Sequence, residues 1–222
     1  MFINREEICN LSRVPVDIEN NPCYKTVLQL INVDMDYKQT VLYEHYKSYT
    51  PKTLYDLYGV GESLKKYSFD CLFLPWIHTS PVTEYSDVAF IQRNDAFISA
   101  QVKKIKALIN SIREIGFKPG LFLDRKGGNI TGYFLHNNKK KFYVVSGNHR
   151  VATLSALFPD MSIPVVYEEE KYLKPRDRKN RIEPPRKIYS YKNIENWPSV
   201  VSGFINQSAA REIMEKYTNG IS

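Results

Sequence analysis

The chain has 222 residues, a formal net charge of +7 and a hydrophobic fraction of 43%. This length and composition suit one ordinary domain with additions, or two small ones, and they exclude a chain that is disordered throughout. The apolar runs are too short for a membrane helix and the first residues do not resemble a signal peptide, so we expect a cytoplasmic protein without membrane insertion.

The N-terminal part, residues 1–88, is only weakly periodic and is expected to form an extension to the main core. Thr40–Tyr58 is rich in tyrosine, at spacings that indicate amphipathic packing. Pro51 interrupts that pattern and predicts a second short helix directly after it. Cys71–Leu74 is an apolar strand candidate, and the irregular loop that follows it contains His78.

The clearest helical pattern runs from Val102 to Ile115, where apolar residues recur at steps of three and four. Gly116 is well placed to end this helix, and Pro119 follows it. The apolar positions are Val102, Ile105, Leu108, Ile109, Ile112 and Ile115.

Short strands separated by turn residues are predicted after this helix. The strands are expected at Leu121–Leu123, Ile130–His136 and Lys141–Val145. A helix is predicted at Arg150–Phe158 from its apolar spacing, and a last strand at Ile163–Tyr167.

The C-terminal part, residues 171–222, is expected to be a basic strap followed by a helix. Lys171–Lys187 contains eight basic and two acidic residues, so this segment holds +6 of the net +7 charge. Any argument for nucleic-acid binding therefore depends on this segment alone. Ser208–Tyr217 has helical spacing, with Ser208 as the expected N-cap.

A possible anion site lies where a buried strand, Phe142–Val145, runs into a glycine turn and a helix starts at once. The first turn of a helix presents backbone N–H groups and the positive end of the helix dipole. Gly147 lets a ligand approach the backbone closely, while His149 and Arg150 can add side-chain donors. A capped helix with two solvated basic residues would have the same local pattern, so both interpretations stay open at this level.

Three motifs in the same order resemble the ParB/sulfiredoxin superfamily. They are the helix end Ser111–Pro119, the turn Gly147–Arg150 and the strand Ile163–Val166. The resemblance spans Ala89–Glu169 and implies an α+β fold, with a small mixed sheet and packed helices in a core at 89–170. It also implies that the turn holds nucleotide phosphates through Ser146, Gly147, Asn148, His149 and Arg150.

The superfamily contains several activities, so the fold alone does not decide the function. Sulfiredoxins have a catalytic cysteine where this chain has Asn148, which argues against sulfiredoxin chemistry. ParB partition proteins usually carry an acidic-arginine version of the turn and a downstream DNA-binding helical domain, and we expect the roughly fifty residues after Glu169 to be too few for such a domain. The turn is most similar to that of free-serine kinases, although Ser146 stands where those proteins have Asp.

The leading hypothesis is a kinase that uses ATP or ADP, with Mg²⁺, to phosphorylate a hydroxyl of a sugar, polyol or amino acid. The candidate catalytic residues are His149, Asp124 and His78. Glu84, Asp87 and Glu114 are further acids whose spacing does not distinguish them from surface residues. The cysteines and histidines show no metal-ligand spacing, so we predict no metal site made of protein side chains alone.

Weaker likeness extends to ParB-like proteins encoded among surface-polysaccharide genes, through the tail Trp197–Val200 and the helix after it. Two alternatives remain. One is a nucleic-acid-binding protein or nuclease that uses Lys171–Lys187, and the other is a nucleotide-binding regulator without catalysis. The sequence leaves open the acceptor, the nucleotide, the catalytic base and the oligomeric state.

Overall fold

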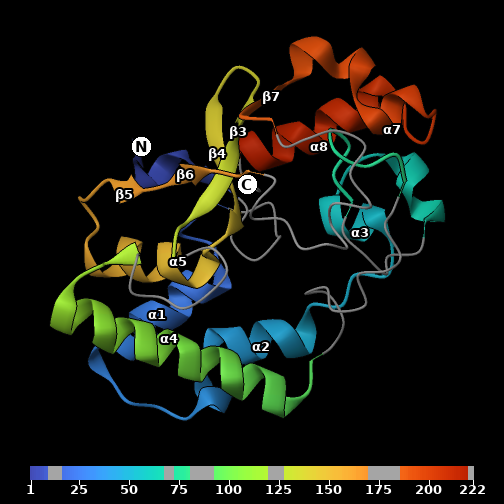
Figure 1. Ribbon diagram of the computed structural model, residues 1–222. Helices are drawn as coiled ribbons and strands as arrows, with labels where there is room; N and C mark the ends of the chain where they lie inside the picture. The colour runs from blue at the N-terminus through green and yellow to red at the C-terminus, as the bar shows by residue number, and fades with distance from the viewer. Residues whose placement is uncertain (10–16, 68–72, 81–92, 120–127, 170–185, 220–222) are drawn as a thin grey trace.

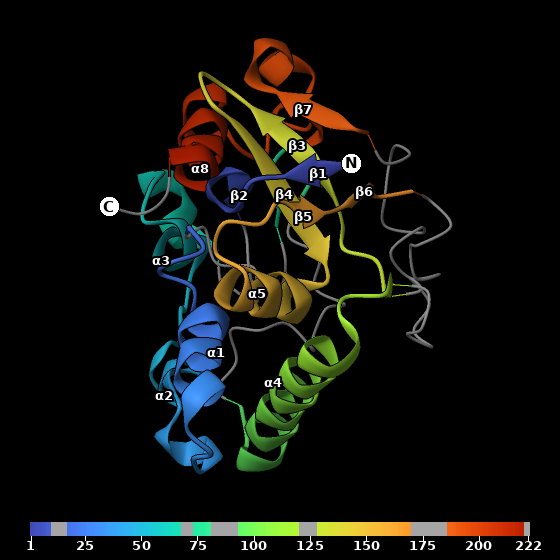
Figure 2. The same ribbon diagram turned by 90° about the vertical axis from the view of Figure 1, so that its left-hand side faces the viewer.

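In the residues that it describes, the computed structural model has an α+β fold in which five strands form a mixed sheet with helices against both faces (Figure 1, Figure 2). The fold class expected from the sequence is therefore confirmed. None of the described helices is long and apolar enough to cross a bilayer. The structure describes residues 1–9, 17–67, 73–80, 93–119, 128–169 and 186–219.

An antiparallel hairpin of β3 (Thr131–His136) and β4 (Lys140–Ser146) forms the centre of the sheet. It confirms the strands predicted at these positions. On the β4 side, β2 (Ile8–Cys9) adds a parallel strand from the N-terminus. On the β3 side, β6 (Val166–Tyr167) and β7 (Ile188–Ser190) both run parallel to β3.

The single strand predicted at Ile163–Tyr167 is wrong, because the chain changes partner within it. Its first half, β5 (Ile163–Pro164), pairs with β1 (Phe2–Ile3) in a small ladder apart from the main sheet. Its second half is β6, which pairs with β3. Val165 lies between them and donates its N–H to the carbonyl of Met1 at 2.9 Å. A short apolar run cannot reveal such a change of partner.

On one face of the sheet, four of the described helices enclose the first of two apolar clusters. The sheet contributes alternate side chains to it, among them Phe134, Phe142 and Val144. We call this cluster the first core. The four helices are α1 (Pro22–Asn32), α2 (Val41–Ser48), α4 (Asp95–Ile115) and α5 (Asn148–Leu157).

The opposite face carries the second core, which is rich in aromatic residues. Tyr133 and Tyr143 stack across the hairpin with ring centroids 5.0 Å apart. The indole Nε1 of Trp76 donates to the hydroxyl of Tyr133 at 3.1 Å, so this polar group is satisfied inside the core. The elements that cover this face are α3 (Leu54–Tyr58), α7 (Pro198–Val201), α8 (Gln207–Asn219) and the 3₁₀ segments Glu62–Lys66 and Tyr191–Asn196.

Helix α4 confirms the predicted helix and extends it by two turns at its N-terminus. It begins after Asn94, whose side chain accepts from the N–H of Phe97, and ends at Gly116, which has a φ of 73°. Val102, Ile105, Ile109 and Ile112 are buried in the first core. The other two apolar positions differ, since Ile115 is exposed and Leu108 is partly buried but belongs to neither core of the described residues.

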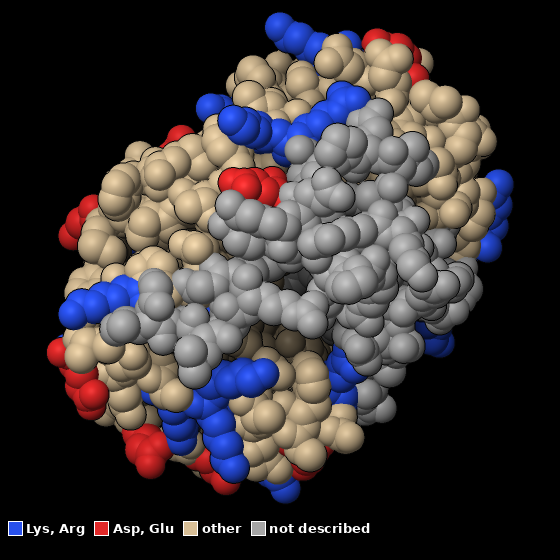
Figure 3. All heavy atoms as spheres, in the orientation of Figure 1, with Lys and Arg blue, Asp and Glu red and all other residues tan. Residues whose placement is uncertain are grey.

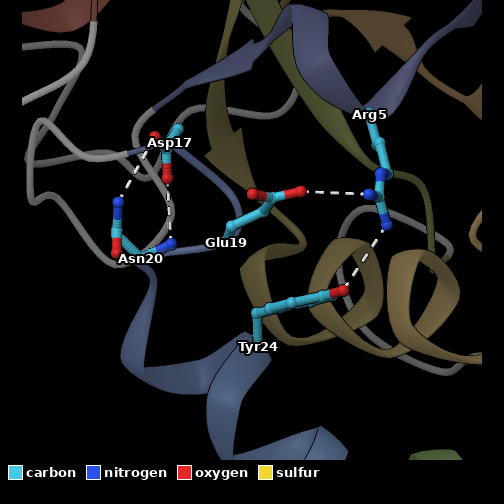
Figure 4. Close-up of polar contacts among 5 residues, drawn as sticks. All are labelled: Arg5, Asp17, Glu19, Asn20 and Tyr24. Carbon is cyan, nitrogen blue, oxygen red and sulfur yellow. Dashed lines mark hydrogen bonds and ion pairs between the residues drawn. The ribbon is translucent and has the colours of Figure 1, made fainter.

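The described residues of the N-terminal part, 1–88, pack directly against the central sheet. They supply strand β2 to the central sheet and helices α1, α2 and α3 to its two faces. Arg5 connects the N-terminal segment to α1 and to the residues just before it (Figure 4). It forms an ion pair with Glu19 at 3.0 Å and donates to the hydroxyl of Tyr24, on α1, at 3.5 Å. The N-terminal segment and the predicted nucleotide-binding core therefore fold around one sheet.

Several local predictions had other outcomes. Leu121–Leu123 and nearly all of Lys171–Lys187 lie outside the described residues, as do the first two residues of Cys71–Leu74, whose last two form no strand. Ser208 lies inside α8 rather than at its start. The amide oxygen of Asn206 accepts from the N–H of Ala209 at 2.8 Å and takes over the capping role.

The hairpin provides a direct test of this packing. Phe142 is 0% exposed, and Phe142→Ala should lower the free energy of unfolding by about 3–5 kcal/mol, because it leaves a cavity in the first core. Phe158 is the matched control, since it is 39% exposed and its replacement by Ala should cost about 1 kcal/mol or less. Urea denaturation of both variants measures the difference, and equal losses would contradict the placement of Phe142.

Candidate functional site

The strand–turn–helix predicted around Gly147 is present, and two independent constraints require glycine there. Gly147 has a φ of 96°, a conformation that other residues adopt only with strain. A Cβ at this position would also lie 3.0 Å from the Cα of Ile130. The N-cap has no side chain, and the first intrahelical bond of α5 runs from the N–H of Val151 to the carbonyl of Gly147. The backbone N–H groups of the first turn of α5 therefore have no partner inside the helix and point out of its N-terminus.

A cavity of about 490 Å³ opens at this turn. Val145–Arg150 form one side of it. Helix α4 forms the facing wall with Gln101, Lys104 and Leu108, and α2 contributes Tyr46. The volume lies within the range of roughly 300–1,000 Å³ that is usual for sites of small ligands. All five predicted phosphate-binding residues, Ser146 to Arg150, line this cavity.

The charged groups around the cavity favour an anion. Lys104 and Arg150 are cationic, and no carboxylate belongs to the lining in the described ranges. Lys104 forms no ion pair with any described residue. Lys and Arg side chains also gather over α4 on this face of the molecule (Figure 3). Together with the positive end of the α5 dipole, these charges suit phosphate or carboxylate groups.

His149 contributes to this site as a neutral group. Burial, and to a smaller extent the charges of Lys104 and Arg150, lower the pKa of its imidazole from 6.5 to about 4. At neutral pH the ring is therefore uncharged, with one nitrogen as donor and the other as acceptor. It can hydrogen-bond a ligand and accept a proton, but as a neutral ring it adds no positive charge to the site.

Asn148 carries an unusual polar atom at the same turn. Its Oδ1 is buried and has no hydrogen-bond donor among the described residues. A buried acceptor without a partner costs about 1–3 kcal/mol, and such groups are rare in native proteins. This observation strengthens the assignment of the turn as a site.

The other predicted catalytic residues are not brought to the cavity in the same way. Asp124 lies outside the described residues. His78 is buried beside the second core, where its Nδ1 accepts from the N–H of Leu74 at 3.0 Å. It does not line the cavity, and its bond to Leu74 holds together the turn that carries Trp76.

Sequence reasoning did not identify the α4 wall of the cavity. The spacing puts Leu108 among the core-facing positions of the helix and the tyrosines of Thr40–Tyr58, which include Tyr46, in amphipathic packing. Each assignment followed from local spacing, and no local pattern shows which helix lies opposite the Gly147 turn. The packing of α4 against α5 and of α2 against α4 brings these residues to the site.

The chain was compared with models of protein families, with curated proteins and with solved structures, and none of the three comparisons found a match.

The lowered pKa of His149 predicts how stability changes with pH. The unfolded state takes up a proton near pH 6.5 and the native state only near pH 4, so His149 lowers the stability as the pH falls through this window. The slope is at most about 1.4 kcal/mol per pH unit. The difference in unfolding free energy between the parent and His149→Gln, measured from pH 7 to pH 4.5, should follow it. An NMR titration that gives a native pKa near 6.5 would contradict the prediction.

Proposed function

We propose that this protein is a nucleotide-dependent phosphotransferase that holds the phosphate groups of ATP or ADP at the Gly147–Arg150 turn. The observation that carries the proposal is the cavity itself, in which the N-terminus of α5 meets Lys104 and Arg150 without a described carboxylate. The resemblance of the turn to those of free-serine kinases supports phosphoryl transfer as the reaction.

Each group at the site has a distinct role in this proposal. The backbone N–H groups at the start of α5 bind phosphate oxygens along the helix axis. Arg150 offers a planar fork for two oxygens, and Lys104 adds a point charge from the facing wall. Phosphoryl transfer depends mainly on such positioning and on stabilisation of charge on the phosphoryl oxygens.

His149 is the group that accepts a proton. A bound phosphate dianion beside the imidazole raises its pKa from about 4 towards its ordinary value, so the ring becomes a stronger base once the nucleotide is present. The acceptor hydroxyl gives its proton to His149 as its oxygen bonds to phosphorus. The bond from phosphorus to the leaving phosphate oxygen of the nucleotide breaks.

The described lining supplies no carboxylate ligand and so does not fit the expected Mg²⁺.

The acceptor in this proposal is a small molecule with a hydroxyl group, such as a sugar, polyol or amino acid. The described part of the chain contains no observation that favours the alternative of nucleic-acid binding. Of Lys171–Lys187, the segment on which that alternative depends, only Arg186 and Lys187 are described.

Nucleotide binding should be visible as thermal stabilisation. At a concentration near 100 times Kd, ATP or ADP should raise the melting temperature by about 5–10 °C, since ligand that binds only the native state stabilises it. Lys104→Ala and Arg150→Ala should lose most of this shift, measured by differential scanning fluorimetry with and without Mg²⁺. Lys103→Ala is the matched control, because Lys103 precedes Lys104 on the same helix but does not line the cavity. Equal shifts in all four proteins would refute the phosphate site.

The reaction requires a separate test. Incubation with ATP labelled at the γ-phosphate, or ADP labelled at the β-phosphate, and a panel of sugars, polyols and amino acids should produce a labelled acceptor. His149→Gln should reduce the rate about 10²–10⁴-fold, the usual contribution of a general base, while nucleotide binding remains. If nucleotide binds but no acceptor is labelled, the protein is a nucleotide-binding regulator instead.

A further inference from the structure

The α4 wall of the cavity changes its chemical character along its length. Gln101, Lys104 and Leu108 are spaced by three and four residues, so they lie on one face of the helix. At 1.5 Å per residue, they span roughly 10 Å of the wall. Along this line a neutral polar group is followed by a cation and then by an apolar side chain.

The two ends of the wall can be placed from their contacts. Tyr46 marks the Gln101 end, because its ring packs edge-on against Phe97, one helical turn before Gln101, with centroids 5.6 Å apart. Helix α2, which carries Tyr46, lies beside the N-terminal half of α4 (Figure 1). Lys104, in the middle, lines the same cavity as His149 of the turn, and its charge contributes to the lowered pKa of the imidazole. The phosphate-binding turn therefore faces the middle of the wall.

The Leu108 end is apolar and lies outside both cores of the described residues. Leu108 is partly buried, yet it packs in neither core of the described residues. Ala107 beside it is exposed and also lines the cavity. Apolar side chains that line a pocket are the usual contact surface for the flat, weakly polar part of a ligand.

The Gln101 end has the opposite character. Tyr46 is 7% exposed, so little of its ring is available as a platform for stacking. Gln101 brings an amide with both donors and an acceptor, the pairing that a hydroxyl group requires. This end suits a small polar ligand rather than a nucleoside.

We propose that the nucleoside of the donor lies against Ala107 and Leu108, and that the hydroxyl-bearing acceptor lies against Gln101, on the other side of Lys104. This inference rests on the proposed function. In-line transfer places the attacking and leaving oxygens on opposite sides of phosphorus, so donor and acceptor must approach a central phosphoryl group from opposite ends. A cavity with a cationic middle and two unlike ends meets that requirement.

Calorimetric titration with two probes separates the nucleoside from its phosphates. The probes are ATP and inorganic tripolyphosphate, which has the phosphates alone. Leu108→Asn should weaken ATP binding about tenfold, because apolar contact with the nucleoside is lost, and leave the Kd of tripolyphosphate unchanged. Leu28→Asn is the matched control, since Leu28 is 46% exposed on α1 and does not line the cavity.

Gln101→Ala tests the other end. It should leave the Kd values of both probes unchanged and raise the KM of the acceptor found in the transfer assay about tenfold. The inference is overturned if Gln101→Ala weakens ATP binding, if Leu108→Asn affects both probes equally or neither, or if the acceptor KM is unaffected. Failure of the parent protein to bind either probe is a different result, since it refutes the proposed function itself.

Discussion

The β3–β4 hairpin is the constraint on which the rest of the structure depends. Side chains alternate between the two faces of a strand, so these two strands contribute side chains to both cores. Phe134 and Phe142 pack under the helices of the first core, while Tyr133 and Tyr143 stack in the second. Short strands from both chain ends then add to its edges, which ties the N-terminal and C-terminal segments to one sheet.

The hairpin also decides where the candidate site lies. β4 ends at Ser146, and a Cβ at position 147 would lie only 3.0 Å from the Cα of Ile130, directly before β3. Helix α5 begins directly after this glycine, and the start of α5 lines the same cavity as α4. The same packing that buries Val151 and Leu154 directs the start of α5 into the cavity.

The cavity combines features that do not contribute to the stability of the fold. Lys104 and Arg150 raise the local positive potential, and together with burial they keep His149 neutral. The Oδ1 of Asn148 is buried without a donor among the described residues, and Leu108 packs in neither core. Groups held in such unfavourable surroundings are typical of sites where a ligand supplies the missing partner. This shared character, rather than any single residue, is the basis of the proposed function.

The sequence by itself determined the local elements, because they depend on neighbours along the chain. The apolar period of α4, its end at Gly116, the two central strands and the glycine turn before α5 were all predicted from spacing and residue type. What only the tertiary structure decided were the pairings between distant segments. Three of these pairings depend on which surfaces meet on folding. They are β2 beside β4, the two partners of Ile163–Tyr167, and Lys104 and Leu108 opposite Gly147. The spacing of residues along one element does not reveal its distant partner, because the pairing depends on how the surfaces of two elements fit each other.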